Sequence, residues 1–139
     1  MTEVEETAAD LWALGLTPGK HPTEFVRERL GARGVVTAYE LRELEHHSVV
    51  EVAGVVTHRQ QPSTAKGVIF LNLEDETGMV NVICTPDVWR RFRKVARVAP
   101  ALQIRGMLER YQGVINLLAQ RITALPLTVA DLLRSRDFR

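Results

Sequence analysis

Five strand-like segments, with one helical segment between the third and the fourth, constrain this chain more than any other feature. The five segments are rich in β-branched residues or alternate between apolar and polar residues, as β-strands do. We expect strands at residues 49–57, 68–74, 79–84, 101–111 and 114–124. Gly54 lies inside the first segment, where a glycine favours a bulge or a sharp bend of the kind that a barrel strand needs.

The helical segment is marked by its ends and by its periodicity. Thr85 supplies a hydroxyl at the N-cap, Pro86 suits the first helical position, and Pro100 ends the segment. The spacing of one buried helical face is followed by Val88, Trp89, Phe92, Val95, Ala96 and Ala99. The order strand, strand, strand, helix, strand, strand is that of the OB-fold, a five-stranded barrel. We therefore predict a mainly β chain with helical flanks.

Three parts make up the predicted organisation. A barrel at residues 49–125 follows a helical lead segment at residues 1–48 and precedes a short C-terminal tail at residues 126–139. Short helices are expected at residues 2–14, 22–30 and 37–44. Thr37 and Glu40 have the spacing of a capping box at the start of the last of these helices. The lead segment is too short for a core of its own, so we expect it to pack on the barrel.

Charge is divided unevenly along the chain, although its formal net charge is only +1. Residues 1–48 carry nine acids and five bases, whereas residues 49–124 carry ten bases and six acids. A moderately basic barrel suits an anionic ligand. Five of these bases lie in the helical segment, where a solvated face opposite the buried one is the ordinary interpretation and direct contact with nucleic acid is the alternative.

Residues that could carry catalysis or hold a metal form no recognisable constellation. The four histidines lack metal-ligand spacing, and Cys84 is the single cysteine, which excludes a disulfide or a multi-thiolate site within one chain. The acids at residues 74–76 precede Thr77 and Gly78 and are more typical of a turn than of a cation site. Residues 63–67 lack the leading glycine of a phosphate loop. We expect no catalytic residue, no metal and no cofactor.

The hydropathy of the chain bears on its location. No apolar run approaches the roughly 20 residues of a membrane span. No basic leader followed by an apolar stretch begins the sequence, so no signal peptide is predicted. We expect a cytoplasmic protein with no membrane partner.

Alternation in the second and third strand-like segments predicts a binding face. The inward positions are Ile69, Leu71, Leu73, Val80 and Val82. The outward positions are Phe70, Asn72, Glu74, Asn81 and Ile83. OB barrels bind single strands across the outer surface of these two strands and the loops beside it. We therefore expect the outward positions to face a nucleic acid.

The candidate binding residues follow from that placement. Phe70 offers a stacking platform, worth about 1–3 kcal/mol per base. The candidate set is Arg59, Gln60, Gln61, Lys66, Phe70, Asn72, Asn81, Arg110 and Tyr111. Packing under the loop or against the lead helices is the alternative for Phe70, and simple solvated charges are the alternative for Arg59 and Lys66.

A long central motif carries a family resemblance. Residues 55–78, with Arg-Gln-Gln-Pro-Ser-Thr-Ala-Lys-Gly at 59–67, resemble the C-terminal OB region of bacterial C-family DNA polymerases. That family holds the replicative polymerase III alpha subunit and its error-prone homologue. The loop and the closing Ser-Arg-Asp-Phe-Arg at 135–139 are more similar to the error-prone branch. Residues 15–22 resemble the segment that precedes the barrel in both branches.

The resemblance implies a piece of an error-prone polymerase used in damage-induced mutagenesis and translesion synthesis, a part of DNA repair. The family's catalytic carboxylates lie in a palm domain that nothing here matches. We therefore expect a C-terminal fragment with an artificial Met1 and no enzymatic activity of its own. The family's barrel lies near the template, which implies single-stranded DNA as the partner.

The resemblance also implies an alternative role in protein docking. The error-prone branch works with an accessory mutasome protein that resembles an inactive Y-family polymerase and contacts the sliding clamp, so clamp contact here would be indirect. Docking would use Trp12, Phe25 and Phe138, or the face of the barrel. A weaker third interpretation is an anticodon-binding barrel of a tRNA synthetase, which has a similar Phe-Leu-x-Leu-x-Asp strand. The flanking Gly-Lys-His-Pro and Ser-Arg-Asp-Phe segments argue against it.

Overall fold

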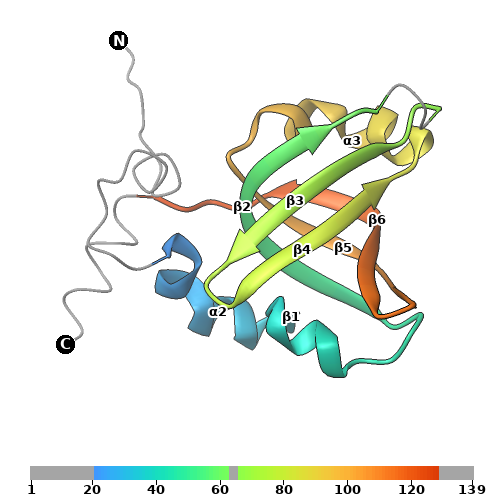
Figure 1. Ribbon diagram of the computed structural model, residues 1–139. Coiled ribbons are helices and arrows are strands. Elements are labelled where there is room, and N and C mark those ends of the chain that lie inside the picture. The colour runs from blue at the N-terminus through green and yellow to red at the C-terminus, as the bar shows by residue number, and fades with distance from the viewer. Residues whose placement is uncertain (1–20, 63–65, 129–139) are drawn as a thin grey trace, which may run out of the picture.

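Five strands close into a barrel in the computed structural model, which describes residues 21–62 and 66–128 (Figure 1). The strands are β2 (Val49–Gln60), β3 (Ile69–Asp75), β4 (Gly78–Cys84), β5 (Ala101–Tyr111) and β6 (Val114–Ala124). They pair in the order β2-β3-β4-β6-β5, and β5 pairs back with β2. Within the barrel only the β4–β6 pairing is parallel. Helix α3 (Pro86–Val98) joins β4 to β5, so the predicted order of the OB-fold is confirmed.

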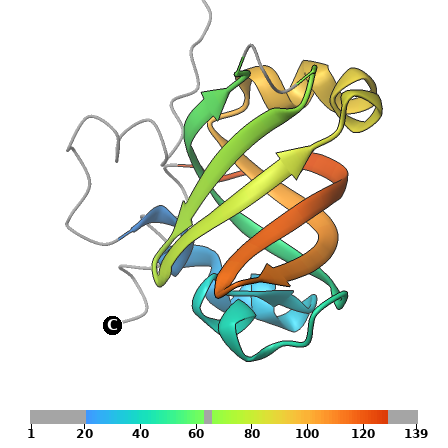
Figure 2. The same ribbon diagram turned by 45° about the vertical axis from the view of Figure 1, so that its right-hand side comes forward.

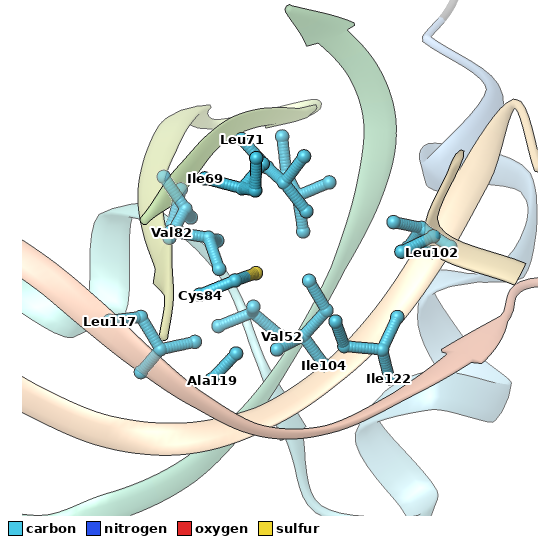
Figure 3. Close-up of a cluster of buried hydrophobic side chains, with 14 of the residues drawn as sticks. Val52, Ile69, Leu71, Val82, Cys84, Leu102, Ile104, Leu117, Ala119 and Ile122 are labelled. Carbon is cyan, nitrogen blue, oxygen red and sulfur yellow. The ribbon is translucent and has the colours of Figure 1, made fainter. Parts of the chain in front are cut away.

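Aliphatic side chains from every strand fill the barrel (Figure 3). Val52, Val82, Ile104 and Leu117 have no exposed surface, and Leu71 has almost none. The inward positions predicted for β3 and β4 are all buried. At roughly 1.5–3 kcal/mol for each large aliphatic side chain, this burial is the main stabilising contribution to the fold.

Helix α3 covers one end of the barrel (Figure 2). The Thr85 hydroxyl accepts a hydrogen bond from the Val88 amide, as an N-cap residue does. The predicted inner face of the helix packs on the barrel core through Val88, Trp89, Phe92, Val95, Ala96 and Ala99. The bases of the helix consequently lie on its solvent side.

Strand β2 differs from its prediction in length and in the position of its irregularity. It continues to Gln60 instead of ending at Thr57, so Arg59 and Gln60 lie in a strand and not in the loop. Its register against β3 shifts between Val56 and His58. Gly54 lies where β2 passes close to β3, since a Cβ there would be 2.8 Å from the carbonyl oxygen of Glu74.

The described part of the lead segment forms four short elements. They are the 3₁₀ helix η1 (Pro22–Val26), α2 (Arg27–Ala32), β1 (Val35–Val36) and the 3₁₀ helix η2 (Tyr39–Glu43). The predicted capping box is confirmed, because the Thr37 amide donates to Glu40 and the Glu40 amide donates to Thr37. Strand β1, which pairs in parallel with β2, was not predicted. The helix expected at residues 2–14 lies outside the described residues.

A second apolar cluster joins this segment to the barrel. It contains Val26, Leu30, Val35, Ala53, Val55, Ala101, Leu125 and Leu127. Residues before β2 and after β6 therefore meet on the same side of the barrel. The cluster gives the lead segment a hydrophobic anchor that it lacks by itself.

The β3–β4 turn adds a polar anchor, which we call the turn cluster: Thr23, Arg27, Ala38, Asp75, Glu76 and Thr77. The guanidinium of Arg27 donates to both carboxylate oxygens of Glu76, at 2.6 and 2.9 Å. The Thr23 hydroxyl donates to Glu76 at 2.6 Å. Asp75, only 3% exposed, accepts from the amides of Ala38 and Thr77. These acids serve as turn residues that hold the lead segment.

Candidate nucleic-acid interface

The outer face of β3, β4 and β6 carries two rows of side chains, which we call rungs. Strand register aligns Phe70 with Ile83 and Ile83 with Leu118, which together form the apolar rung. The same register aligns Asn72, Asn81 and Asn116 as the amide rung. Paired residues on neighbouring strands point to the same face of a sheet. Both rungs therefore face away from the barrel core.

The side chains of these rungs are accessible from outside. Phe70, Ile83 and Leu118 are half-buried, and neither core cluster includes them. In the amide rung, Nδ2 of Asn72 donates to Oδ1 of Asn81 at 2.6 Å. That bond leaves the Asn72 oxygen and the Asn81 amide nitrogen able to bond to a ligand. The face thus offers an apolar stacking row beside a row of amides.

Asn116 and Leu118 lie on the same outer face as the candidate residues of β3 and β4, and the sequence did not predict them. They come from β6, whose parallel pairing with β4 brings together positions more than 30 residues apart. Local alternation gives each strand's two faces but not which strands are neighbours. Only the complete barrel topology places them beside Asn81 and Ile83.

Arg59 points to the opposite side of β2 from Gln60. It pairs with Leu71, an inward position, whereas Gln60 pairs with Phe70. Its Nε donates to the carbonyl of Ala96 at 2.8 Å, and its Nη2 donates to that of Ala99 at 2.6 Å. Burial lowers the pKa of this guanidinium. Arg59 therefore bonds to carbonyl groups that the C-terminal end of α3 leaves without helical partners.

Arg110 makes a similar contact at the other end of the barrel. Its Nη2 donates to the carbonyls of Leu41 and Leu44, where η2 ends. Its backbone amide donates to Nδ1 of His46 at 3.0 Å. The side chain thereby joins the lead segment to β5.

The remaining candidates are spread along the face. Gln60 and Phe70 lie toward the end covered by α3, and the exposed Gln61 and Lys66 adjoin the β2–β3 connection there. Asn72 and Asn81 lie in the middle. Tyr111, 72% exposed, lies at the far end beside the predicted β5–β6 turn, where Gln112 and Gly113 both have positive φ. The candidates do not converge on one pocket but follow the length of the face.

A cavity of about 230 Å³ lies at the far end, between η2 and the β3–β4 turn. Its lining includes Tyr39, Leu41, Arg42, Met79, Val80 and Ile115. Tyr39 and Met79 are each more than half exposed, and Arg42 lies over the Tyr39 ring at 5.0 Å. Sequence reasoning missed this apolar site, because Tyr39 and Met79 come from elements that only tertiary packing brings together.

The predicted docking residues are placed only in part. Phe25 is half-buried and packs against the second apolar cluster. Trp12 and Phe138 lie outside the described residues. Phe25 therefore serves at least partly to hold the lead segment on the barrel.

Neither a metal cluster nor a reactive thiol is found among the described residues. Residues 21–62 and 66–128 contain no group of three or more His, Cys, Asp or Glu side chains that could hold a metal ion. Burial raises the pKa of the Cys84 thiol to about 12, so it is not a thiolate nucleophile at neutral pH. No helix in the same part of the chain is long and apolar enough to cross a membrane.

Comparison with solved structures agrees with the fold. The asparaginyl-tRNA synthetase from Pyrococcus horikoshii aligns with a TM-score of 0.56 and 20% identity, over 68% of this chain and 23% of that one. The hypothetical protein ygiW from E. coli aligns with a TM-score of 0.52 and 17% identity, over 66% of this chain and 89% of that one. At such low identity these likenesses show the shared barrel alone.

Comparison with curated sequences confirms the family resemblance. The chain is 53% identical over its whole length to the error-prone DNA polymerase of Mycobacterium tuberculosis (strain ATCC 25618 / H37Rv). It is 45% identical over 96% of its length to that of Anaeromyxobacter sp. (strain K). The match is to the C-terminal region of these polymerases, and the chain spans 12% of their length. Residues 50–125 also match a family described as "OB-fold nucleic acid binding domain", so the chain belongs to that family.

Proposed function

We propose that this chain binds single-stranded DNA across the outer face of β3, β4 and β6, as part of an error-prone polymerase that copies damaged templates. The observation that carries the proposal is the pair of rungs on that face. Membership of a nucleic-acid-binding family supports it. So does the similarity to error-prone polymerases.

The two rungs suit bases of any sequence. Every base has a π-face that can stack on Phe70, with Ile83 and Leu118 extending the apolar surface. Side-chain amides both donate and accept, so the amide rung can bond to the edges of all four bases. A face of this kind favours tolerance over sequence readout, as copying of arbitrary or damaged templates requires.

The flanking candidates would guide the strand onto this face. Lys66 and Gln61 at one end offer a cation and an amide to phosphates and base edges. Tyr111 at the other end offers a second, more exposed aromatic ring. Arg59 and Arg110 belong to this proposal only through the donors that their carbonyl bonds leave unused.

Fluorescence anisotropy with a labelled single-stranded oligonucleotide tests the proposal. We expect Phe70→Ala to weaken binding about tenfold, because one stacked base is worth about 1–3 kcal/mol. Phe70→Tyr is the matched control, since it keeps the ring and should bind like wild type. An unchanged melting temperature shows that each variant is folded. Wild-type affinity in Phe70→Ala, or no binding by wild type at low salt, would reject this face.

The exposed apolar residues at the far end favour a second candidate function, docking of the accessory mutasome protein. Tyr39 and Met79 border a cavity large enough to accept an apolar side chain. The test is biolayer interferometry with the purified accessory protein. Docking there predicts that Met79→Ser weakens the complex and leaves binding of single-stranded DNA unchanged. Equal binding of the accessory protein by Met79→Ser and wild type excludes this site.

A further inference from the structure

The solvent side of α3 carries five cations: Arg90, Arg91, Arg93, Lys94 and Arg97. We call this set the α3 cation row. Asp87 is the single acid of the helix, and it pairs with Arg90 at 2.9 Å. Both partners are largely exposed, at 69% and 89%, so the pair neutralises little of the row. No carboxylate of the described residues forms an ion pair with the other four cations.

The row offers charge without stacking surface. The aromatic residues of the helix, Trp89 and Phe92, are half-buried against the barrel core, on the other side of the helix from the cations. Arg91 lies over the Phe92 ring at 5.7 Å, which further covers that ring. Cations without exposed rings contact phosphates and carry no base readout. The ligand that fits this surface is therefore a polyanionic backbone.

The row adjoins the proposed binding face. Gly67, which lies just before β3, is next to the start of α3, since a Cβ on Gly67 would lie 3.2 Å from the Pro86 ring. Arg59 holds the other end of the helix to β2. Phe70, at the start of β3, lies on the same end of the barrel, which α3 covers in Figure 1. A strand that crosses the rungs toward this end therefore meets the α3 cation row next.

We propose that the α3 cation row binds the phosphate backbone of the DNA single strand as it leaves the outer face of the barrel. This inference rests on the proposed function and extends its site beyond the sheet. A helix of 13 residues is about 20 Å long. It can therefore follow several successive phosphates and lengthen the footprint beyond the nucleotides that the rungs hold.

Oligonucleotide length separates the two parts of the site. OB-folds bind about 4–16 nucleotides, so a strand of about six should occupy the rungs alone and one of about 16 should also reach α3. The test variant is Arg93→Gln/Lys94→Gln/Arg97→Gln. The matched control is Arg33→Gln/Arg105→Gln/Arg121→Gln, which removes the same charge near Glu51, on another side of the barrel. Anisotropy is measured for each over a range of salt concentrations.

We expect the α3 variant to bind the long strand at least about tenfold more weakly at low salt. The slope of log affinity against log salt concentration should become shallower by about two. Each lost phosphate contact removes about 0.7 from that slope, and the variant loses three. Binding of the short strand should stay within about twofold of wild type. The control variant should bind both strands as wild type does. The melting temperatures of both variants check that they are folded.

Three results would overturn the inference. Wild-type affinity and salt dependence for the long strand in the α3 variant would show that the row does not contact it. An equal loss in the control variant would show an effect of net charge alone. The α3 variant is also compared with wild type on a duplex of about 16 base pairs. Weaker binding of that duplex, with unchanged binding of the single strand, would show that the row binds duplex DNA instead. In each case the effect of Phe70→Ala on the short strand still decides the proposed function separately.

Discussion

At the scale of single residues, Arg59 and Arg110 show that a cation near a binding face can stabilise the fold itself. Both resemble nucleic-acid contacts in sequence, yet each donates to backbone carbonyls where a helix ends. The sequence shows that each residue is charged and which residues are next to it in the chain. It does not show to which face of the strand the side chain points. For Arg59 the register shift before His58 sets that side.

Replacement of Arg59 by methionine should lower the free energy of unfolding by about 1–2 kcal/mol. The change keeps the aliphatic stem but removes the two charged hydrogen bonds to Ala96 and Ala99. Urea denaturation measures the effect. Arg93→Met, at an exposed position in the helix that Arg59 contacts, is the control and should stay within about 0.5 kcal/mol of wild type. A fully stable Arg59→Met that loses DNA binding would instead assign Arg59 to the phosphates.

Glu76 should make stability depend on pH in the acid range. Burial alone would raise the pKa of this carboxyl, but hydrogen bonds from Arg27 and Thr23 outweigh it and lower the pKa from 4.5 to about 2. The lowered pKa means that the ionised Glu76 stabilises the fold, with the full effect above about pH 4.5 and its loss as the pH falls through about 2. Urea denaturation between pH 6 and pH 2 measures it. Glu76→Gln should lack this part of the pH dependence, and parallel curves for the two proteins would contradict the assignment.

At the scale of elements, strand crossings limit which residues the barrel accepts. Gly54→Ala should cost about 1–3 kcal/mol, because the added Cβ would lie 2.8 Å from the Glu74 carbonyl oxygen and 3.1 Å from its amide nitrogen. Gly31→Ala is the matched control. It lies in α2 with nothing within 4 Å, so alanine should stabilise by about 0.5–1 kcal/mol. Thermal or urea unfolding of both variants checks the contrast, and a neutral Gly54→Ala would disprove the close crossing.

Elements with a strong local signal were predictable from the sequence. The alternation of β3 and β4, the Thr85-Pro86 start of α3 and the Thr37–Glu40 capping box all follow from neighbouring residues. Strand β1 was not predictable, because two residues carry no periodicity and pair only once β2 is in place. The full rungs also escaped prediction, since Asn116 and Leu118 join them through the β4–β6 pairing.

At the scale of the whole molecule, the proposed DNA path occupies one part of the surface and leaves another free. The path runs over the rungs to the α3 cation row. Elsewhere Gln103 donates to Glu51 at 2.6 Å, with Arg105 and Arg121 each 3.7 Å from the same carboxylate. These cations are balanced by an acid, whereas four cations of the α3 row have no such neighbour among the described residues. The two surfaces therefore differ more in whether their cations have an acidic neighbour than in how many cations they carry.

NMR titration with a strand of about 16 nucleotides should reveal this division. Backbone amide shifts are expected to change at residues 70–72, 81–83, 116–118 and 90–97. Amides at Glu51, Arg105 and Arg121 should remain unchanged, because nothing in the proposed path reaches them. Uniform changes over the whole barrel, or changes confined to the Glu51 side, would contradict the path.

The turn cluster also determines where a mechanical load would enter the barrel. Soon after His21, Thr23 and Arg27 connect to the tip of the β3–β4 hairpin. The pairing of β1 with β2 follows only at Val35. A pull at Arg27 would therefore be transmitted to the hairpin that carries Asn72 and Asn81. Tension on this side of the domain and the DNA that we propose for its outer face would act on the same two strands.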